Sequence, residues 1–318
     1  MKKHKIILGV VVVALIIFGF WYAQKPKETK SIKMSYIPAS CDLVNFVAQE
    51  KGFYAEEGLN VELTKFDTSN QASDALLAGR IDASGCFAYP VAFSVEATQP
   101  DTYKSIRSII ASPDHPFLWL VAKAGDESIK SFKDLAGKKI GRFPGSTTEA
   151  QLKYILKKVG VDPNSVTMLP IAQAQQINAL ISGSVDALFV LEPTPTVAEI
   201  QGVGRKVENA ETYFPNPRYN ALYAVLKSYY RNNKDIVGRI EKAQDKAVDY
   251  IRQNPDEARK VLTKYTPYDE SIVLKVDPGY ALKSDEKIDL AKIQEYADIL
   301  LSEGDLKSKV DVSKLFSE

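Results

Sequence analysis

The sequence has few of the residues on which catalytic chemistry usually depends. Its 318 residues include only two histidines and two cysteines, and the formal net charge is +1. His4 precedes the N-terminal apolar run, and His115 stands between two prolines without an obvious partner. Acid–base catalysis therefore has little support. Because no block of like charge occurs, nothing points to nucleic acid. We expect no enzyme, no cofactor and no nucleic-acid partner.

The two cysteines leave their own chemistry open. Cys41 and Cys86 do not have the spacing of a metal site, whose ligands are usually clustered, so we expect no metal. An oxidising location would permit a disulfide between them. Two small, buried, unpaired thiols are the alternative.

The N-terminus differs in kind from the rest of the chain. A basic start, Lys2 to Lys5, precedes an uninterrupted apolar run from residue 6 to residue 22. This pattern predicts a signal peptide or signal-anchor helix over residues 1–23, with the folded part extracytoplasmic. Trp21 fits poorly at a cleavage site, so we expect an uncleaved anchor in the cytoplasmic membrane. Residues 24–31 are polar and predict a tether.

The remaining chain predicts an α/β fold in two lobes, since 318 residues with 45% hydrophobic content can bury a large core. Strands alternate with helices, which favours mostly parallel sheets flanked by helices. The predicted strands cover residues 32–37, 59–65, 81–86, 117–123, 138–143, 166–169, 185–190 and 221–226. We assign residues 32–116 and 220–318 to lobe 1 and residues 117–219 to lobe 2, with a ligand cleft between them. Ligands of such sheets bind at the carboxyl ends of strands.

One turn in lobe 2 is well suited to a polar ligand. After the strand at 138–143, Pro144 and Gly145 form a turn, and three hydroxyl residues open a helix. A helix start of this kind presents unpaired N–H groups and hydroxyls, which suit an anionic or strongly polar small molecule. Ordinary helix capping is the alternative.

Several longer segments together resemble a known family. QEKGFYAEEGLNVELTKFD and NQASDALLAGRIDAS in lobe 1 are followed by DLAGKKIGRFPGSTTEAQLKYILKKVGVD, QQINALISGSVDALFVLEPTPTVA and AVDYIRQNPDEARKVL. In this order they resemble the periplasmic-type solute-binding proteins for sulfonate, taurine, nitrate and thiamine precursors. The resemblance covers about residues 32–265. Leu191 stands where that family commonly has an aromatic residue.

The resemblance implies a two-lobed periplasmic binding protein fold of type II, which closes over a small molecule by hinge motion. It also implies a monomer that delivers its ligand to an ABC permease and its ATPase. The ligand could be a sulfonate, a nitrate-like anion or a thiamine-precursor heterocycle. The alternative is an enzyme of the same fold that acts in thiamine-pyrimidine synthesis, for which a Cys41 nucleophile is conceivable. The ligand-binding residues implied by position are Ala39, Ser40, Cys41, Ser84, Gly85, Cys86, Ser146, Thr147, Thr148 and Glu192.

Other side chains near these positions carry two interpretations each. Glu192 could accept a hydrogen bond from an amine or aminopyrimidine, or it could be a structural acid that fixes its loop. Arg142 could reach an anion by a forked contact, but we expect it to point to solvent. The large aromatic residues nearby could line the cleft, but we expect them in the core: Phe87, Tyr89, Trp119 and Phe143.

Overall fold

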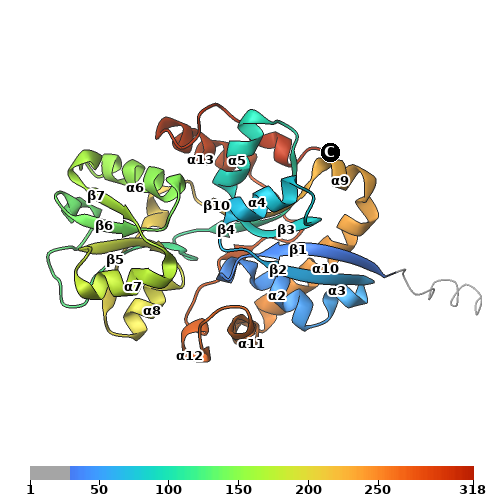
Figure 1. Ribbon diagram of the computed structural model, residues 1–318, viewed down its shortest axis with the longest axis horizontal. Helices are drawn as coiled ribbons and strands as arrows, with labels where there is room; N and C mark the ends of the chain where they lie inside the picture. Colours follow the sequence, from blue (N-terminus) through green and yellow to red (C-terminus); the bar gives the residue numbers. More distant parts are fainter. Residues whose placement is uncertain (1–28) are drawn as a thin grey trace, which may run out of the picture.

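The computed structural model describes residues 29–318, which form two lobes, each a β-sheet flanked by helices (Figure 1). The predicted two-lobed α/β fold is confirmed. The predicted signal or anchor at residues 1–23 and the tether as far as residue 28 lie outside the described residues. Within residues 29–318, none of the helices combines the length and the apolar character needed to cross a membrane.

Lobe 1 is organised around a six-stranded sheet in the order β11-β4-β10-β3-β1-β2. Strand β1 pairs in parallel with β2 and β3, whereas β10 and β11 pair antiparallel with their neighbours. The strands are β1 (Lys30–Tyr36), β2 (Leu59–Lys65), β3 (Ala83–Ala88), β4 (Tyr103–Ala111), β10 (Arg218–Leu226) and β11 (Tyr280–Ala281).

Lobe 2 has a five-stranded sheet in the order β7-β6-β8-β5-β9. Strand β6 is parallel to β7 and β8, and β5 is antiparallel to β8 and β9. The strands are β5 (Leu118–Lys123), β6 (Lys139–Arg142), β7 (Thr167–Pro170), β8 (Ala187–Leu191) and β9 (Gly204–Asn209). Both sheets are therefore mixed, but β1, β2, β3 and β4 run in one direction in lobe 1, and β6, β7, β8 and β9 do so in lobe 2. The prediction of mostly parallel sheets is confirmed. Strands β5 and β10, which run against most strands of their sheets, each begin directly after a segment that crosses between the lobes. Neither is therefore joined to its neighbours by a helical crossover.

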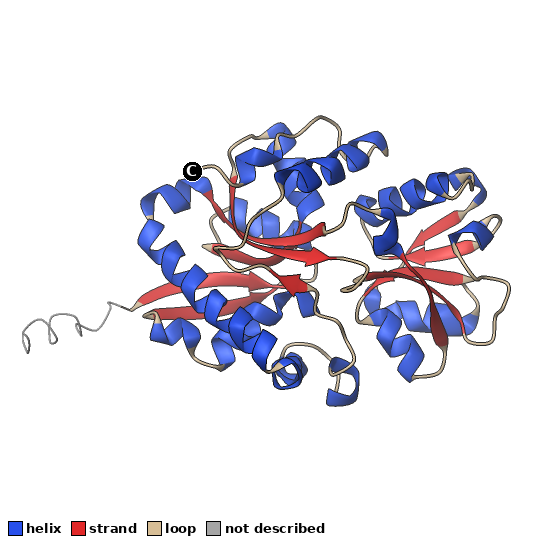
Figure 2. Cartoon of the chain, turned by 180° about the vertical axis from the view of Figure 1, so that it is seen from behind, coloured by secondary structure: helices blue, strands red, loops and turns tan. Residues whose placement is uncertain are grey.

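Helices cover both faces of each sheet (Figures 1 and 2). In lobe 1, α2, α3 and α10 share one apolar core, while α4, α5 and α13 pack into another. In lobe 2, α6 covers one face and α7 and α8 cover the other. Their bounds are α2 (Leu43–Glu50), α3 (Phe53–Glu56), α4 (Ser69–Leu77), α5 (Tyr89–Thr98), α6 (Ser146–Lys158), α7 (Gln173–Ser182), α8 (Thr194–Ile200), α9 (Lys227–Asn232), α10 (Lys234–Gln253), α11 (Pro255–Lys260), α12 (Glu270–Val273) and α13 (Leu290–Ser302).

The long helix α10 shows why this sequence folds as it does. Its buried positions recur three or four residues apart: Val237, Ile240, Ala243, Gln244, Ala247 and Val248. This period places them on one stripe of the helix, which packs against α2 and α3. The charged residues of α10 fall on the other faces, as the sequence pattern predicts.

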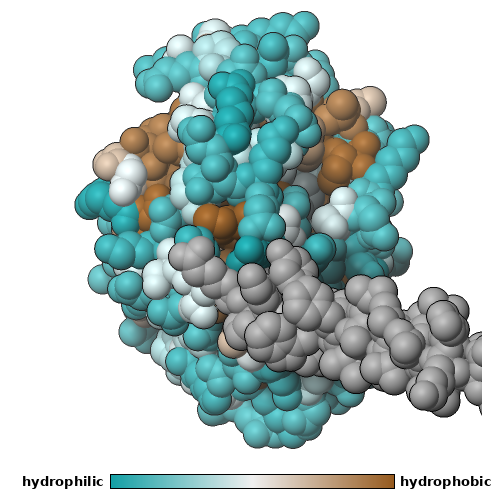
Figure 3. All heavy atoms as spheres, turned by 90° about the vertical axis from the view of Figure 1, so that its right-hand side faces the viewer, coloured by the Kyte–Doolittle hydropathy of each residue, from teal (hydrophilic) through white to brown (hydrophobic). Residues whose placement is uncertain are grey.

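The apolar side chains exposed in residues 29–318 are scattered. Seen from the outer end of lobe 1, apolar side chains gather in separate areas between hydrophilic ones (Figure 3). The exposed large apolar side chains of the described chain lie on four different helices: Leu77 on α4, Ile181 on α7, Ile200 on α8 and Leu290 on α13. Scattered residues of this kind need no binding partner.

The second crossing between the lobes contains a buried ion pair. Arg218 begins β10, and its Nε and Nη2 atoms donate to the two carboxylate oxygens of Glu211 at 2.7 and 2.6 Å. Both side chains are at most 2% exposed. The guanidinium also lies 5.5 Å from the ring centroid of Phe214 and 5.6 Å from that of Tyr296. Two-point contact with buried charges makes this pair sensitive to the loss of either partner.

Glu211→Gln should lower the free energy of unfolding by about 3–5 kcal/mol, because it leaves the buried Arg218 guanidinium without a counter-charge. The matched control is Glu295→Gln, which removes a partly exposed pair with Lys292 at 3.0 Å. That change should cost less than about 1 kcal/mol. Urea unfolding measures both values, and equal losses would contradict the assignment.

Candidate functional site

A buried carboxyl group holds the turn that follows β1. The side chain of Asp42 accepts a hydrogen bond from the Ile37 backbone N–H at 2.8 Å. Its other oxygen accepts from the Cys86 backbone N–H and from Asn45 Nδ2, both at 2.9 Å. Asp42 is fully buried. One side chain therefore joins the turn at residues 37–42, which we call the lobe 1 rim, to strand β3.

Strand β3 passes so close to Asp42 that one of its positions accepts only glycine. A Cβ atom at Gly85 would lie 2.2 Å from Asp42 Oδ1 and 2.6 Å from the Ser35 carbonyl oxygen. The predicted strand ended at residue 86, but β3 continues to Ala88. Ser84, Gly85 and Cys86 therefore lie within the strand rather than at its carboxyl end, and their contact with a ligand stays a prediction.

A disulfide settles the alternatives left open for the cysteines. Cys41 and Cys86 are bonded, with an S–S distance of 2.01 Å, and close a loop of 45 residues. The Tyr223 hydroxyl donates to the Cys41 carbonyl oxygen at 2.8 Å. The bond ties the lobe 1 rim to β3 a second time, next to the Asp42 contact. Because each sulfur is bonded to the other, Cys41 offers no thiolate for nucleophilic catalysis in this form.

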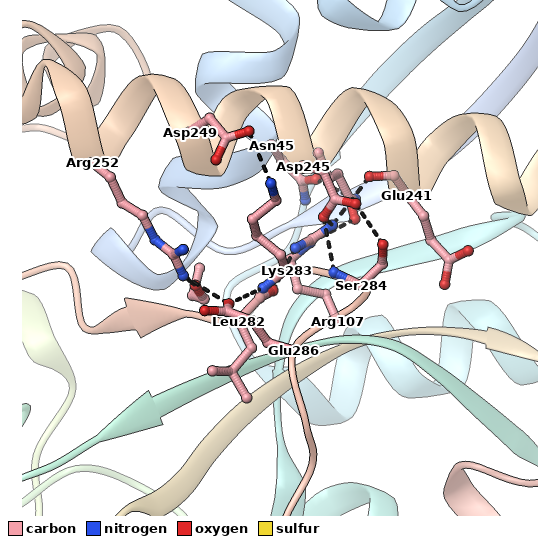
Figure 4. A network of polar contacts seen from close by, with 12 residues as sticks. Asn45, Arg107, Glu241, Asp245, Asp249, Arg252, Leu282, Lys283, Ser284 and Glu286 are labelled. Atoms are coloured by element: carbon pink, nitrogen blue, oxygen red, sulfur yellow. Dashed lines mark hydrogen bonds and ion pairs between the residues drawn. The ribbon is translucent and has the colours of Figure 1, made fainter.

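A chain of hydrogen bonds leads from Asp42 through Asn45 to α10. Figure 4 shows the surroundings of Asn45, Arg107 and Asp245 in this network. Gln244 Nε2 donates to Asn45 Oδ1 at 3.0 Å, and Arg107 Nε donates to Gln244 Oε1 at 3.1 Å. Arg107 also donates to Asp245 at 2.8 Å. Burial raises the pKa of Asp42 to about 7, although its three donors act to lower that pKa. This network therefore supports the lobe 1 rim from within, with the Asp42 carboxyl group at its inner end.

The remaining lobe 1 candidates differ in exposure. Ala39 is half-buried, whereas Ser40 and Ser84 are buried, and their hydroxyls make no hydrogen bond within residues 29–318. Ser40 lines a small cavity of about 50 Å³ together with Val44, Ile109, Tyr280 and other residues. Ser84 lies within β3 and is fully buried.

The hydroxyl turn of lobe 2 is held by contacts other than capping. Gly145 precedes α6 with a φ of 110°, a conformation that favours glycine. The Thr148 hydroxyl donates back to the Phe143 carbonyl oxygen at 2.6 Å, and the Thr147 hydroxyl donates to Asp305 at 3.1 Å. Ser146 begins α6, and its side chain lies outside the described part. The predicted side-chain cap of this helix is not formed by Thr147 or Thr148.

Arg142 supports the same turn instead of facing solvent. Its guanidinium donates to the Gly145 carbonyl oxygen at 2.7 Å and to the Phe143 carbonyl oxygen at 3.2 Å, and it is paired with Glu149. Arg142 is only 6% exposed, so the prediction of a solvent-facing side chain was wrong. The turn needs a donor for its inward carbonyl oxygens, and Arg142 supplies it.

Glu192 has the contacts of a structural acid. It is 2% exposed and forms an ion pair with Lys206 at 2.8 Å. Burial raises the pKa of Glu192, while the nearby Lys206 opposes this rise. The bond from Glu192 to Pro193 is cis, and Lys206 also donates to Thr196 Oγ1 at 3.0 Å. Of its two interpretations, the one in which Glu192 fixes its loop is favoured.

The structure gathers the candidates into two groups. Ala39 to Cys41 and Cys86 are brought together on lobe 1 by the disulfide. The hydroxyl turn and Glu192 follow β6 and β8, which are neighbouring parallel strands. In the described chain no hydrogen bond joins one group to the other, and contact with a ligand stays a prediction. Phe87 and Tyr89 are in the core as expected, whereas Trp119 and Phe143 are half-buried.

Sequence reasoning missed the residues that support the site. Asp42 lies where the sequence predicts the rim, but its role as a support gives no sequence signal, because a lone aspartate in a turn is typical of local hydrogen bonding. Gly85 in a strand pattern, beside a cysteine, was the one available signal of close backbone approach. Asp305 gave no local signal, since its partner Thr147 lies 158 residues away.

Known proteins resemble this chain over most of its length. Residues 43–258 match the family model described as NMT1/THI5 like. This chain belongs to the NMT1/THI5-like family. The formylaminopyrimidine-binding protein of Halalkalibacterium halodurans is 26% identical over 249 residues, which cover 74% of this chain and 70% of that protein. A protein of Brucella abortus (strain 2308), named only as a binding protein, is 25% identical over 280 residues and 84% of each chain.

The family also contains proteins named as enzymes. The 4-amino-5-hydroxymethyl-2-methylpyrimidine phosphate synthase THI13 of Saccharomyces cerevisiae is 22% identical over 245 residues, covering 74% of this chain and 70% of the synthase. No group of three or more histidine, cysteine or acidic side chains in residues 29–318 could hold a metal ion.

Solved structures show the same fold. The periplasmic aliphatic sulphonate binding protein SsuA of Escherichia coli has a TM-score of 0.76 at 17% identity, over 91% of this chain and 98% of SsuA. The periplasmic nitrate-binding protein NrtA of Synechocystis PCC 6803 has a TM-score of 0.70 at 16% identity, over 88% and 83%. At these identities the likeness establishes the two-lobed fold alone.

Gly85→Ala should strongly destabilise this family member, because its Cβ would overlap the Asp42 carboxyl group and the Ser35 carbonyl oxygen. Overpacking of this kind costs about 1–3 kcal/mol or more. Gly238→Ala is the matched control, since Gly238 lies inside α10 and a Cβ there meets nothing within 4 Å. The control should stabilise by about 0.5–1 kcal/mol. Thermal unfolding compares the two, and a harmless Gly85→Ala would disprove the close contact.

Proposed function

We propose that the protein is an extracytoplasmic solute-binding protein that captures a small molecule by closing its two lobes and hands it to an ABC importer. The family membership and the two-lobed fold support this proposal. The disulfide between Cys41 and Cys86 supports an oxidising, extracytoplasmic location. Anchoring by residues 1–23 remains part of the proposal, because that segment lies outside the described residues.

We further propose that the ligand is a pyrimidine-like heterocycle rather than a sulfonate or nitrate. The observation that carries this choice is the pairing of charges at the lobe 2 end of the cleft. Arg142 is committed to Glu149 and two carbonyl oxygens, and Lys206 is committed to Glu192. An anion would compete with these carboxylates for its cation, which costs binding energy.

Polar groups suited to a heterocycle remain in both groups of candidate residues, on lobe 1 and on lobe 2. The Ser40 hydroxyl makes no hydrogen bond within the described chain, and such groups bind waters or ligands. Carbonyl oxygens and hydroxyls of the two groups can accept from ring amines. The H. halodurans relative, named for a formylaminopyrimidine, supports the same ligand class.

The second candidate function is synthesis of a thiamine pyrimidine, favoured only by relatives such as the yeast synthase. Its conceivable Cys41 nucleophile is bonded to Cys86. Binding and catalysis differ in whether the ligand survives: a binding protein returns it unchanged, and a synthase does not.

A thermal-shift series with formylaminopyrimidine, an aliphatic sulphonate and nitrate tests the function. A ligand at a hundred times its Kd should raise the Tm by roughly 4–8 °C. We expect this shift with formylaminopyrimidine and little with the two anions. Chromatography of the bound compound after incubation should recover it intact. A larger shift with either anion would contradict the ligand class, and conversion of the compound would contradict the binding function.

A further inference from the structure

The two lobes are joined firmly along one side by helices α6 and α13. Thr147 Oγ1 donates to Asp305 Oδ2 at 3.1 Å, and Lys157 Nζ donates to Glu303 Oε2 at 2.6 Å. Between them Gln151 Nε2 donates to the Tyr296 hydroxyl at 2.7 Å, where both side chains are buried. All three donors are on α6 of lobe 2. Their acceptors are on α13, which follows the last strand of lobe 1, or on the loop after α13.

Aromatic rings continue this junction through the second crossing. Tyr154 of α6 stacks on Phe214 with ring centroids 5.7 Å apart, and Phe214 lies 6.0 Å from Tyr296. Tyr296 in turn lies 6.2 Å from Phe93 on α5 of lobe 1. The same apolar cluster includes Leu152 of lobe 2 and Leu300 of α13. A continuous, close-packed core of this kind does not slide or separate easily.

The opposite side of the junction is different. There the four-residue helix α12 of lobe 1 packs against α8 of lobe 2 (Figure 1). At the first crossing, Asn209 Nδ2 of lobe 2 donates to the Pro113 carbonyl oxygen of lobe 1 at 3.1 Å. Within residues 29–318, the side-chain hydrogen bonds and ion pairs that join α6 to lobe 1 lie on the α6–α13 side. The α12 segment is tied instead to its own side: Asp277 binds His115 at 3.1 Å. A contact with few buried groups opens at low cost.

We propose that the lobes stay joined along α6 and α13, and that the cleft opens and closes along α8 and α12. The α6–α13 contact acts as a fixed hinge, and α12 is the part of lobe 1 that approaches α8 when the cleft closes. The hydroxyl turn at the start of α6 then keeps its position relative to lobe 1 throughout. The Glu192 end of β8 and helix α8 form the half of the cleft that moves. This goes beyond the capture of a ligand and holds whatever the ligand is.

Two spin-label pairs measure the motion on each side without any ligand. Gln201→Cys with Ser271→Cys labels the α8–α12 side, and Asn164→Cys with Glu295→Cys labels the α6–α13 side. All four positions are exposed. The native cysteines are bonded to each other, so a thiol-specific label reaches only the introduced ones. Double electron–electron resonance should give a distance distribution for 201–271 that is roughly twofold wider, or bimodal, against one narrow distance for 164–295.

A substitution pair checks that α13 supplies the restraint. Thr147→Val removes the hydrogen bond to Asp305 and should widen the 164–295 distribution, while Thr147→Ser keeps the hydroxyl and should leave it narrow. Equal widths in the unsubstituted background, a wider 164–295 distribution, or two narrow distributions would each overturn the proposal. None of these results depends on which compound binds, so they are distinguishable from failure of the proposed function.

Discussion

The buried carboxyl group of Asp42 is the contact on which the rest of the candidate site depends. It takes hydrogen bonds from the turn after β1, from β3 and from α2, and it excludes every residue but glycine at position 85. The disulfide repeats the link between the turn and β3 in covalent form. A site prepared in this way loses less conformational entropy when it binds a ligand.

The two lobes contribute to the cleft in different ways. Lobe 1 offers a rim held from within, and lobe 2 offers a turn held by Arg142 and an acid held by Lys206. Arg142 and Glu192, which the sequence suggested as ligand contacts, therefore form contacts within the fold. This use of the charges is the reason why we propose that a ligand is selected by hydroxyls, carbonyl oxygens and shape, as a heterocycle would be. The asymmetric junction through α13 lets that selection occur by movement of one side only.

Much of the fold could be predicted from the sequence because its signals are local. Strand β2 was predicted with its observed bounds, since it has a clear apolar alternation and a stop signal. Helix α5 was missed because its few polar residues, Ser94, Glu96 and Thr98, do not gather on one face. Strand β9 was missed because its sequence, GRKVEN, is charged like a loop.

The candidate site was harder to predict, because its supports are distant in sequence. The partners of Asp42 and Arg107 depend on how β3, β4 and α10 meet, and no periodicity encodes that. The solvent-facing interpretation of Arg142 failed for the same reason: alternation along a strand does not show which carbonyl oxygens need a donor. The positions at strand ends were predicted well where a turn residue marked them, as at Gly145.

The most direct test is a pH titration of the Asp42 carboxyl carbon by ¹³C NMR, with the amide protons of Ile37 and Cys86 followed in parallel. Burial raises the pKa of Asp42 from 3.8 to about 7, so the folded state favours the neutral form. The stability from this group should then be complete below about pH 4 and lost as the pH rises through 7. We predict one carboxyl carbon with a midpoint near 7, absent in Asp42→Asn, and both amide protons shifting with it. A midpoint near 3.8 would contradict the effect of burial on Asp42, and amide protons of Ile37 and Cys86 that do not follow the carboxyl carbon would contradict its central role.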